Sequence, residues 1–414
     1  MAKTCCLFFY EGYISVSPTI ISLSKSFASK GYIVVIFATK TQYYEFKPDS
    51  GQVKTVYFSK GHNIPLINFF YKLFYRIKLG SLVPVIDLIV FGFQVASYIV
   101  RNYKLVSPQT SVDIGVDTNG SILALINHYI FNKKFIYLSL EIYPFSYFRK
   151  FSKILKLFEC LAYRQAETII VQDQDRFDSL CKYNNFQPTT VFYLPNSPSS
   201  LDKSSENVSN NNYFRDKFNL REDKFSCLLV QAGMIEDRVF SKELAYAFNY
   251  IDNEYVLIYH EREKRDIHDP YIEELQKLNS KNLFLSLDPL PIEEINRVFD
   301  SVTIGLAFYR NVDNNFSQIS KASGKLAYYL KSGKPLLVNN LESLAKLVLR
   351  YKIGVVIDNP CDPIEIEAAI KKILNKYDFY SENAKICFAT EFDFANKVNP
   401  LLSHISNWSN ITES

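Results

Sequence analysis

Short, continuous apolar runs alternate with amphipathic segments along most of the 414-residue chain. Uninterrupted apolar runs are typical of strands buried on both faces of a parallel sheet, and apolar residues three and four positions apart are typical of helices that cover it. In the N-terminal half the expected strands are 4–10, 33–38, 53–58, 111–116, 134–140, 167–172 and 190–195. This pattern predicts a doubly wound α/β domain, in which ligands collect at the carboxyl ends of the strands.

The alternation stops at Pro195 and then restarts. The segment PNSPSSLDKSSENVSNNN is polar and rich in serine and asparagine, which indicates a linker. Further apolar runs follow at 225–231, 255–260, 282–287, 301–308, 335–338 and 353–358. We therefore expect two Rossmann-like domains facing a cleft. Their expected bounds are 1–196 for the first domain, 197–224 for the linker, 225–389 for the second domain, and 390–414 for a C-terminal helix that crosses back to the first.

Three candidate site residues follow expected strands of the first domain. Gly12 follows strand 4–10, Asp117 follows 111–116, and Glu141 follows 134–140. We expect Asp117 in a loop, and a long helix over about 146–164 after Glu141. A carboxylate at this edge could serve as a general base, with Glu141 the first candidate and Asp117 the second. A helix cap or a surface carboxylate is an equal alternative for Glu141.

The stretch SKASGKLAYYLKSGKP, 320–335, predicts a helix with both ends marked. Ser323 is placed to cap its N-terminus, and Gly333 ends it. Free N–H groups, the positive end of the helix dipole and an ammonium group then coincide at Ser323, Gly324 and Lys325, a combination that suits a phosphate. Taken alone, the same residues also fit an ordinary cap beside a solvated lysine.

Histidine and cysteine positions give no metal-ligand spacing. The five histidines are scattered, and the seven cysteines are odd in number and lack a C-x-x-C pair, so we expect neither a metal site nor a disulfide framework. This cysteine usage favours a reducing cytoplasm. His260, which ends the strand 255–260, could line a nucleotide pocket or could be structural.

Charge is unevenly distributed along the chain, although the net charge is only +4. Up to Pro198 there are 21 Lys and Arg against 12 Asp and Glu, and beyond it 26 against 31. The basic, aromatic-rich first domain could face an anionic membrane or simply be solvated. The segment 68–78 suits an interfacial amphipathic helix or an ordinary helix packed on a sheet. The apolar segment 82–100 is interrupted by proline and polar residues, so we expect a buried helix there and no membrane span.

The loop glycine, the hinge sequence VFYLPNSP and the stretch SGKLAYYLKSGKPLL resemble nucleotide-sugar glycosyltransferases of the GT-B fold, in particular the large retaining family 4 type. The order of IIVQDQDR before LPNSP is also similar to bacterial enzymes that build capsule or lipopolysaccharide sugars. The resemblance implies a metal-independent enzyme that binds the donor diphosphate in the second domain and the acceptor mainly in the first. The implied diphosphate contacts are Ser323, Gly324, Lys325, Gly233 and Arg238, with Gly12 in the loop that closes over donor and acceptor.

The sequence departs from that family at two positions. Family 4 enzymes usually carry two glutamates eight positions apart, the second five residues before the glycine of G-x-P. Counted back from Gly333, those positions hold Ser320 and Tyr328. The resemblance implies that the first position meets the donor sugar and the second meets the ribose. A tyrosine hydroxyl could still bind a ribose, or the ring could simply pack.

The sequence as a whole therefore predicts a cytoplasmic glycosyltransferase, peripheral on the inner face of the plasma membrane. It would need no cofactor and would move a sugar from a nucleotide sugar to a glycan or lipid-linked acceptor. In a retaining reaction the leaving phosphate accepts the acceptor's proton, so no protein nucleophile is required. Two alternatives stay open: a glycosyltransferase-like subunit that binds without turnover, and a non-hydrolysing nucleotide-sugar epimerase. Nucleic-acid motifs and a G-x-G-x-x-G fingerprint are both missing, which argues against nucleic-acid binding and against a dehydrogenase.

Overall fold

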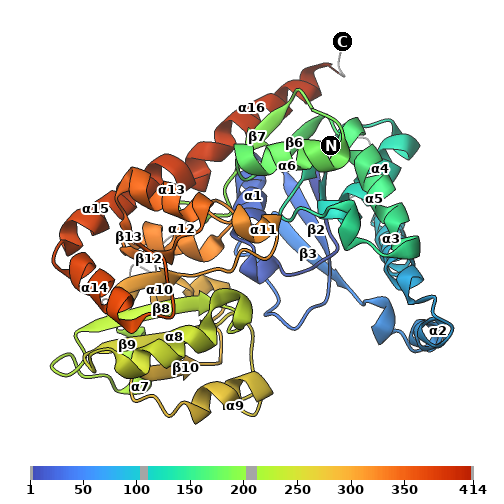
Figure 1. Cartoon of the computed structure of the whole chain (residues 1–414). Coiled ribbons are helices and arrows are strands. Elements are labelled where there is room, and N and C mark those ends of the chain that lie inside the picture. The colour runs from blue at the N-terminus through green and yellow to red at the C-terminus, as the bar shows by residue number, and fades with distance from the viewer. Residues whose placement is uncertain (1–2, 103–110, 202–211, 412–414) are drawn as a thin grey trace.

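The computed structural model describes residues 3–102, 111–201 and 212–411, which form two α/β domains, each built on its own parallel sheet (Figure 1). The first sheet belongs to the N-terminal half of the chain and the second to the C-terminal half. This arrangement confirms the predicted fold class of two doubly wound Rossmann-like domains.

The first sheet has seven parallel strands in the order β3-β2-β1-β4-β5-β6-β7. Cys5 of the central strand β1 pairs with Val34 of β2 on one side and Val112 of β4 on the other, so the strand order reverses between β1 and β4. Ligands bind beside such a reversal in doubly wound sheets. The strands are Thr4–Phe9 (β1), Ile33–Thr39 (β2), Val53–Phe58 (β3), Ser111–Val116 (β4), Phe135–Leu138 (β5), Thr168–Val171 (β6) and Val191–Tyr193 (β7).

The second sheet has six parallel strands in the order β10-β9-β8-β11-β12-β13. Its order reverses between β8 and β11, where Val230 pairs with Ile258 on one side and Gly305 on the other. The strands are Cys227–Gly233 (β8), Tyr255–Glu261 (β9), Leu283–Ser286 (β10), Ile304–Ala307 (β11), Leu336–Asn339 (β12) and Gly354–Ile357 (β13).

Helices cover both faces of the first sheet because its apolar runs expose hydrophobic side chains on both sides. Pro18–Ser29 (α1) and Phe394–Ile411 (α16) pack on one face. Val83–Arg101 (α3), Asp117–Phe131 (α4) and Lys153–Gln165 (α5) pack on the other. Two more helices complete the domain: Pro65–Arg76 (α2), at its periphery, and Gln174–Asn184 (α6), which follows β6.

The second sheet is covered in the same way. One face carries Tyr213–Phe218 (α7), Asn296–Asp300 (α10), Gly324–Lys331 (α12) and Glu342–Tyr351 (α13). The other carries Ser241–Ala247 (α8), Pro270–Lys277 (α9) and Pro363–Leu374 (α14), with Tyr377–Cys387 (α15) contributing to both cores. The short helix Asn314–Ser317 (α11) lies between the domains.

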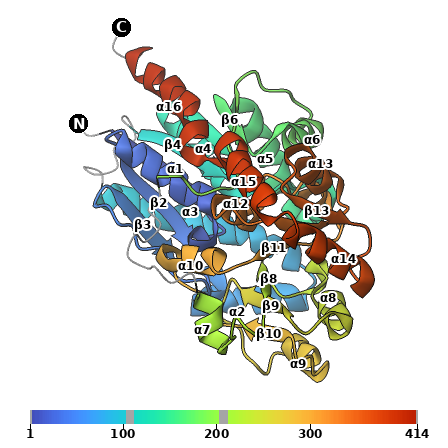
Figure 2. The same ribbon diagram turned by 90° about the vertical axis from the view of Figure 1, so that its left-hand side faces the viewer.

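The C-terminal helix α16 returns to the first domain, as both views show (Figures 1 and 2). Its residues Val398, Leu401 and Ile405 are buried in the same apolar cluster as Ile20 and Leu23 of α1. Pro400 lies inside this helix. A segment that follows the whole second domain in sequence thus completes the core of the first.

Loops at the carboxyl ends of the two sheets meet. Asn315 of α11 accepts a hydrogen bond from Ile142 N at 2.8 Å and donates to Ile142 O at 3.1 Å. At the hinge, Asn196 N donates to Lys321 O at 2.8 Å. These contacts place the ends of the first-domain strands opposite the start of α12.

Three details differ from the sequence prediction. The loop expected at Asp117 is absent, because Asp117 adopts a left-handed backbone (φ 51°) and α4 begins at that residue. The helix expected over 146–164 starts only at Lys153, after two single 3-10 turns and a left-handed Lys150 (φ 44°). Segment 82–100 forms the helix α3. The prediction that this helix is buried is wrong, since only 22% of its most apolar 18-residue stretch is buried. Part of the expected linker, 202–211, lies outside the described residues.

The same stretch, 80–101, is the one helix in the described ranges that is long and apolar enough to cross a membrane. Leu88, Phe91 and Val95 pack into the core beneath the first sheet, and the opposite side of the helix is largely exposed. We therefore treat α3 as a surface helix of the first domain.

Candidate functional site

The start of α12 has the geometry that its sequence predicts. Ser323 Oγ accepts a hydrogen bond from Leu326 N at 3.4 Å, and Gly333 ends the helix region with φ 62°. Tyr309, which follows β11, fixes the cap through a 2.8 Å hydrogen bond between its hydroxyl and Ser323 Oγ. First-turn N–H groups have no acceptor within their own helix, so this end is suited to an anion.

Lys325 extends from the first turn over the ring of Tyr309, with its Nζ 4.6 Å from the ring centroid. Burial lowers the pKa of its ammonium group to about 7, and the nearby charge of Arg262 adds to the effect. Within the described residues, no carboxylate lies within ion-pair distance of Lys325. The side chain is therefore a partly buried cation whose charged form would be stabilised by a bound anion.

Arg262 is a second cation in this group, although sequence reasoning missed it. It follows β9, its backbone N donates to Gly233 O at 3.2 Å, and its guanidinium lies 5.5 Å from the ring centroid of Tyr43 in the first domain. Its Nη2 is 3.0 Å from Met234 Sδ, a weak acceptor. No ion pair joins Arg262 to a carboxylate in the part of the chain that the structure describes. The position after a strand of the second sheet was the signal that could have identified it.

Gly233 and Arg238 lie after β8, at the strand reversal of the second sheet. Gly233 has φ 113°, and a Cβ there would meet nothing within 4 Å, so its backbone borders open space. Arg238 is already paired with Glu236, through Nε–Oε1 and Nη2–Oε2 distances of 2.9 Å each, and it lies 5.3 Å over the Phe316 ring. Arg238 is thus a weaker candidate for an anion contact than Lys325 or Arg262.

Three carboxyl groups gather at the carboxyl ends of the neighbouring strands β1, β4 and β5: Glu11, Asp117 and Glu141. Burial raises the pKa of each, to about 7 for Glu11 and well above the ordinary value for Asp117, where the charge of Glu11 adds to the effect. Arg176 and Arg262 oppose the shift at Glu141. Sequence reasoning identified Asp117 and Glu141 but missed Glu11, which precedes the loop glycine.

Asp117 anchors this group. Its Oδ1 accepts hydrogen bonds from Leu140 N at 2.6 Å and Glu141 N at 3.0 Å, so it fixes the turn that carries Glu141. Its Oδ2 is buried without a hydrogen-bond partner in the described ranges, as is Oε2 of Glu11. Asn119 donates to Glu11 Oε1 at 3.5 Å. Asp117 therefore positions the turn that carries Glu141, and each of the three carboxyl groups retains free acceptor capacity among the described residues. The predicted roles of Glu141 and Asp117 as a general base stay predictions.

Arg176 of α6 supports the same turn. Its Nη2 donates to Leu140 O at 2.7 Å and to Asn315 Oδ1 of the second domain at 3.1 Å. The side chain is fully buried, and its Nε and Nη1 have no partner among the described residues. Arg176 thus joins the carboxyl-bearing turn to α11 and retains unused donors.

Gly12 lies beside Glu11 in the loop after β1. Its φ is 81°, and a Cβ at this position would lie only 2.0 Å from Thr39 O. The close approach of the loop to the end of β2 explains the glycine within the first domain itself. Its predicted contact with a donor diphosphate stays a prediction.

The remaining predicted site residues are His260, Tyr328 and Ser320. His260 Nδ1 bonds Ser286 Oγ at 2.8 Å, and burial against Phe214 lowers its pKa to about 3, so it is neutral. Tyr328 is stacked on Phe299 at 4.8 Å in the core between α12 and α10. Ser320 is buried ahead of the α12 cap. The structure therefore gives His260 and Tyr328 packing roles, and it leaves their predicted ligand contacts untested.

Among the described residues no group of three or more His, Cys, Asp or Glu side chains has the arrangement of a metal site. The arrangement instead offers cations and helix N–H groups on one side and carboxyl groups on the other. It can accommodate a diphosphate at α12 and a hydroxyl-bearing molecule at β1, β4 and β5.

Comparison with known proteins identifies the fold. No protein-family model and no curated protein matches the sequence. Sucrose-phosphate synthase from Thermosynechococcus elongatus is 14% identical, with a TM-score of 0.68 over 100% of both chains. HepE of Anabaena in complex with UDP-glucose is 13% identical, with a TM-score of 0.65 over 97% of this chain and 99% of that one. WaaG, a glycosyltransferase involved in lipopolysaccharide biosynthesis, is 14% identical, with a TM-score of 0.60 over 95% and 96%. The chain has the GT-B fold.

Proposed function

We propose that the protein is a glycosyltransferase, similar to family 4, that moves a sugar from a nucleotide-sugar donor to a glycan or lipid-linked acceptor. One observation carries the proposal: Lys325 at the start of α12 and the nearby Arg262 after β9 lack carboxylate partners among the described residues, and Arg262 acts on the buried Glu141 of the first domain. The structural likeness to HepE with UDP-glucose bound supports a nucleotide-sugar donor.

The chemistry follows from these groups. The acceptor oxygen forms a bond to the anomeric carbon as the bond from that carbon to the diphosphate oxygen breaks. Negative charge then grows on the diphosphate, where the Lys325 ammonium, the Arg262 guanidinium and the first-turn N–H groups of α12 would stabilise it. Glu11 and Glu141 would accept hydrogen bonds from acceptor hydroxyls, with Asp117 holding the turn that carries Glu141.

We propose that the anomeric configuration is retained and that no metal ion is required. In a retaining transfer the departing diphosphate oxygen takes the acceptor's proton, so the protein supplies cations and needs no base of its own. Activity in EDTA and NMR assignment of the product anomer test both points. An inverted product would instead make Glu11 or Glu141 the base.

A role in capsule or lipopolysaccharide biosynthesis, at the cytoplasmic face of the plasma membrane, is part of the proposal. The likeness to WaaG, the basic charge of the first domain and the dispersed cysteines support it. Assays with lipid-linked and with soluble glycans test which class of acceptor the protein uses.

The test is a panel of nucleotide sugars, measured by thermal shift and by release of free nucleotide. We expect one donor class to raise the Tm and to be hydrolysed slowly without acceptor. Failure of every nucleotide sugar to stabilise the protein would overturn the proposal.

One alternative has a specific observation in its favour. Positions 320 and 328 hold Ser and Tyr where the family usually has glutamates, and the Tyr328 ring is packed in the core. The absence of these two glutamates is compatible with a subunit that binds a nucleotide sugar without turnover. Stabilisation without nucleotide release, on any acceptor extract, would favour this alternative.

A further inference from the structure

Large apolar side chains are exposed to solvent over one region of the first domain. Monomeric soluble proteins rarely expose apolar residues in contiguous groups of this kind, and such groups usually mark an interaction surface. Leu66 and Phe69 of α2 are 69% and 64% exposed, and Phe93 of α3 is 71% exposed. We call this region the lipid face, and its members are Leu66, Phe69, Phe70, Leu73, Tyr75, Ile77, Ile89 and Phe93.

Helix α2 is held away from the core. Tyr71 is its one buried residue, and the Tyr71 hydroxyl donates to Asp87 Oδ1 of α3 at 2.8 Å. Gly61 N donates to the same oxygen at 3.0 Å. These hydrogen bonds to Asp87 tether α2 at the edge of the domain, where its side chains Leu66, Phe69, Phe70 and Leu73 are exposed. Figure 1 shows α2 projecting from that edge.

The charges beside the lipid face have one sign. From Lys60 to Arg101 the chain carries five Lys and Arg residues and a single acid, Asp87, which is used in the tether. Lys72, Arg76 and Lys78 are exposed among the apolar residues of α2 and the turn after it. Aromatic residues interleaved with lysine and arginine are typical of helices that lie in the interface of an anionic bilayer.

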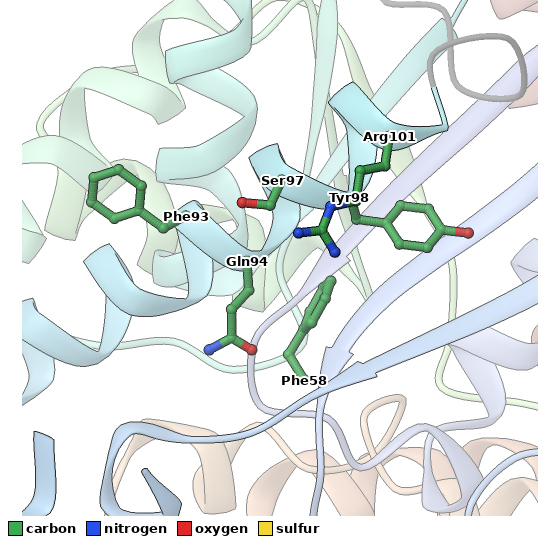
Figure 3. Close-up of a pocket in the computed structure, with 6 residues that line it drawn as sticks. All are labelled: Phe58, Phe93, Gln94, Ser97, Tyr98 and Arg101. Carbon is green, nitrogen blue, oxygen red and sulfur yellow. The ribbon is translucent and has the colours of Figure 1, made fainter. Parts of the chain in front are cut away.

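A shallow hollow of about 340 Å³ adjoins the outer side of α3 and is lined by Phe58, Phe93, Gln94, Ser97, Tyr98 and Arg101 (Figure 3). The Arg101 guanidinium lies between Ser97 and Phe58 in this view, and Arg101 has no ion pair within the described ranges. Tyr98 lines the hollow, but in Figure 3 its hydroxyl points away from Arg101, and it is buried without a hydrogen-bond partner in the described chain. Aromatic walls beside a cation suit the phosphate and glycerol region of a lipid.

We propose that the lipid face docks on an anionic lipid bilayer, with α2 lying in the interface and Arg101 at a lipid phosphate. A second copy of the chain is a poorer occupant. In a two-fold dimer the same surface meets itself, so Lys72, Arg76 and Lys78 would approach their own copies without compensating acids.

Docking in this orientation would bring the bilayer to the acceptor side of the candidate site. Lys60, just before α2, has its Nζ 6.0 Å from the ring centroid of Tyr10, the residue next to Glu11. The purpose of the docking, delivery of a lipid-linked acceptor, rests on the proposed function. The binding itself does not, because it involves neither Lys325 nor Arg262.

The experiment is co-sedimentation of the full chain with vesicles of phosphatidylcholine alone and with 30% phosphatidylglycerol, a composition chosen as a roughly physiological anionic surface. We expect binding to the anionic vesicles that weakens as salt is raised. Phe69→Ser with Phe93→Ser should reduce the bound fraction at least about tenfold, and Lys72→Glu with Arg76→Glu should abolish the preference for anionic vesicles.

The matched control is Leu349→Ser with Ile364→Ser, which removes two exposed apolar residues of the second domain. It should sediment like the unmodified protein. Absence of vesicle binding, equal binding by the Phe69/Phe93 variant, or a dimer in analytical ultracentrifugation that only this variant dissociates would each overturn the proposal. Nucleotide-sugar binding, measured without vesicles, is expected to be unchanged in all three variants, so a failure of the donor site would be seen separately.

Discussion

The two halves of the candidate site differ in how their charges are balanced. In the second domain, Lys325 and Arg262 have no carboxylate partner among the described residues and contact the rings of Tyr309 and Tyr43 instead. In the first domain, the buried Asp117 is bonded to two N–H groups of the turn that it supports. The cationic half therefore lacks a counter-ion that a ligand can supply, whereas in the carboxyl half Asp117 Oδ1 is satisfied internally and oxygens of Asp117 and Glu11 stay free to accept hydrogen bonds. This difference supports the proposal that the anionic donor binds to the second domain.

Lys325→Ala should have the largest effect. A hydrogen bond between charged groups contributes roughly 1.5–3 kcal/mol, so nucleotide-sugar affinity should fall about tenfold to a hundredfold. Isothermal titration calorimetry measures the change. Lys346→Ala, an exposed lysine on α13, is the control and should bind normally. Unchanged affinity in Lys325→Ala would refute the donor-site assignment.

Asp117→Ala should act on stability more than on donor binding. It removes the acceptor of two buried N–H groups and should lower the free energy of unfolding by about 1–3 kcal/mol. Urea unfolding measures this change, and Asp117→Asn, which keeps one acceptor oxygen, is the control expected to lose less. If Asp117→Ala kept wild-type stability but bound the donor more weakly, the proposal that the donor binds only to the second domain would be contradicted.

The pH dependence of stability separates the two halves further. The Glu11 pKa is raised to about 7, so between its unfolded value and pH 7 the folded state binds more protons than the unfolded one, and Glu11 lowers stability as pH rises through that window. The Lys325 pKa is lowered to about 7, so above pH 7 the unfolded state binds more protons and stability rises.

Urea unfolding between pH 5 and 9 should therefore show opposite changes in two variants. Glu11→Gln should remove part of the decrease in stability as pH rises towards 7. Lys325→Met should remove part of the increase in stability above pH 7. Each change in the free energy of unfolding should be on the order of 1 kcal/mol. Parallel profiles for wild type and both variants would show that neither group is shifted by folding.

Arg238→Ala should have the smallest effect. Its guanidinium is paired with Glu236 and partly exposed, and pairs of this kind contribute about 0–1 kcal/mol. We expect less than about a threefold change in donor affinity, against a larger loss for Arg262→Ala. Isothermal titration calorimetry measures the donor affinity of both variants. A greater loss of affinity in Arg238→Ala would mean that Arg238 leaves Glu236 to contact the ligand.

Sequence reasoning predicted the fold and several of the residues that form the candidate site. The alternating apolar runs identified the strands, because strands buried on both faces leave an uninterrupted signal. The cap at Ser323 and the carboxyls Asp117 and Glu141 were identified from their positions at element ends. Glu11 and Arg262 also follow strands, but only the spatial neighbours Asn119 and Tyr43 distinguish them from other charged loop residues. The exposed side of α3 was missed because composition does not reveal which side of an apolar helix is covered.

Proton uptake on donor binding tests the central claim most directly. A nucleotide sugar carries a diphosphate that does not titrate near neutral pH, while the Lys325 ammonium has its pKa lowered to about 7 and should regain its proton beside that diphosphate. Titration of the best-stabilising nucleotide sugar at pH 8, in two buffers of different ionisation enthalpy, should show uptake of close to one proton that disappears in Lys325→Ala. Binding without proton uptake, or uptake that persists in that variant, would contradict the account.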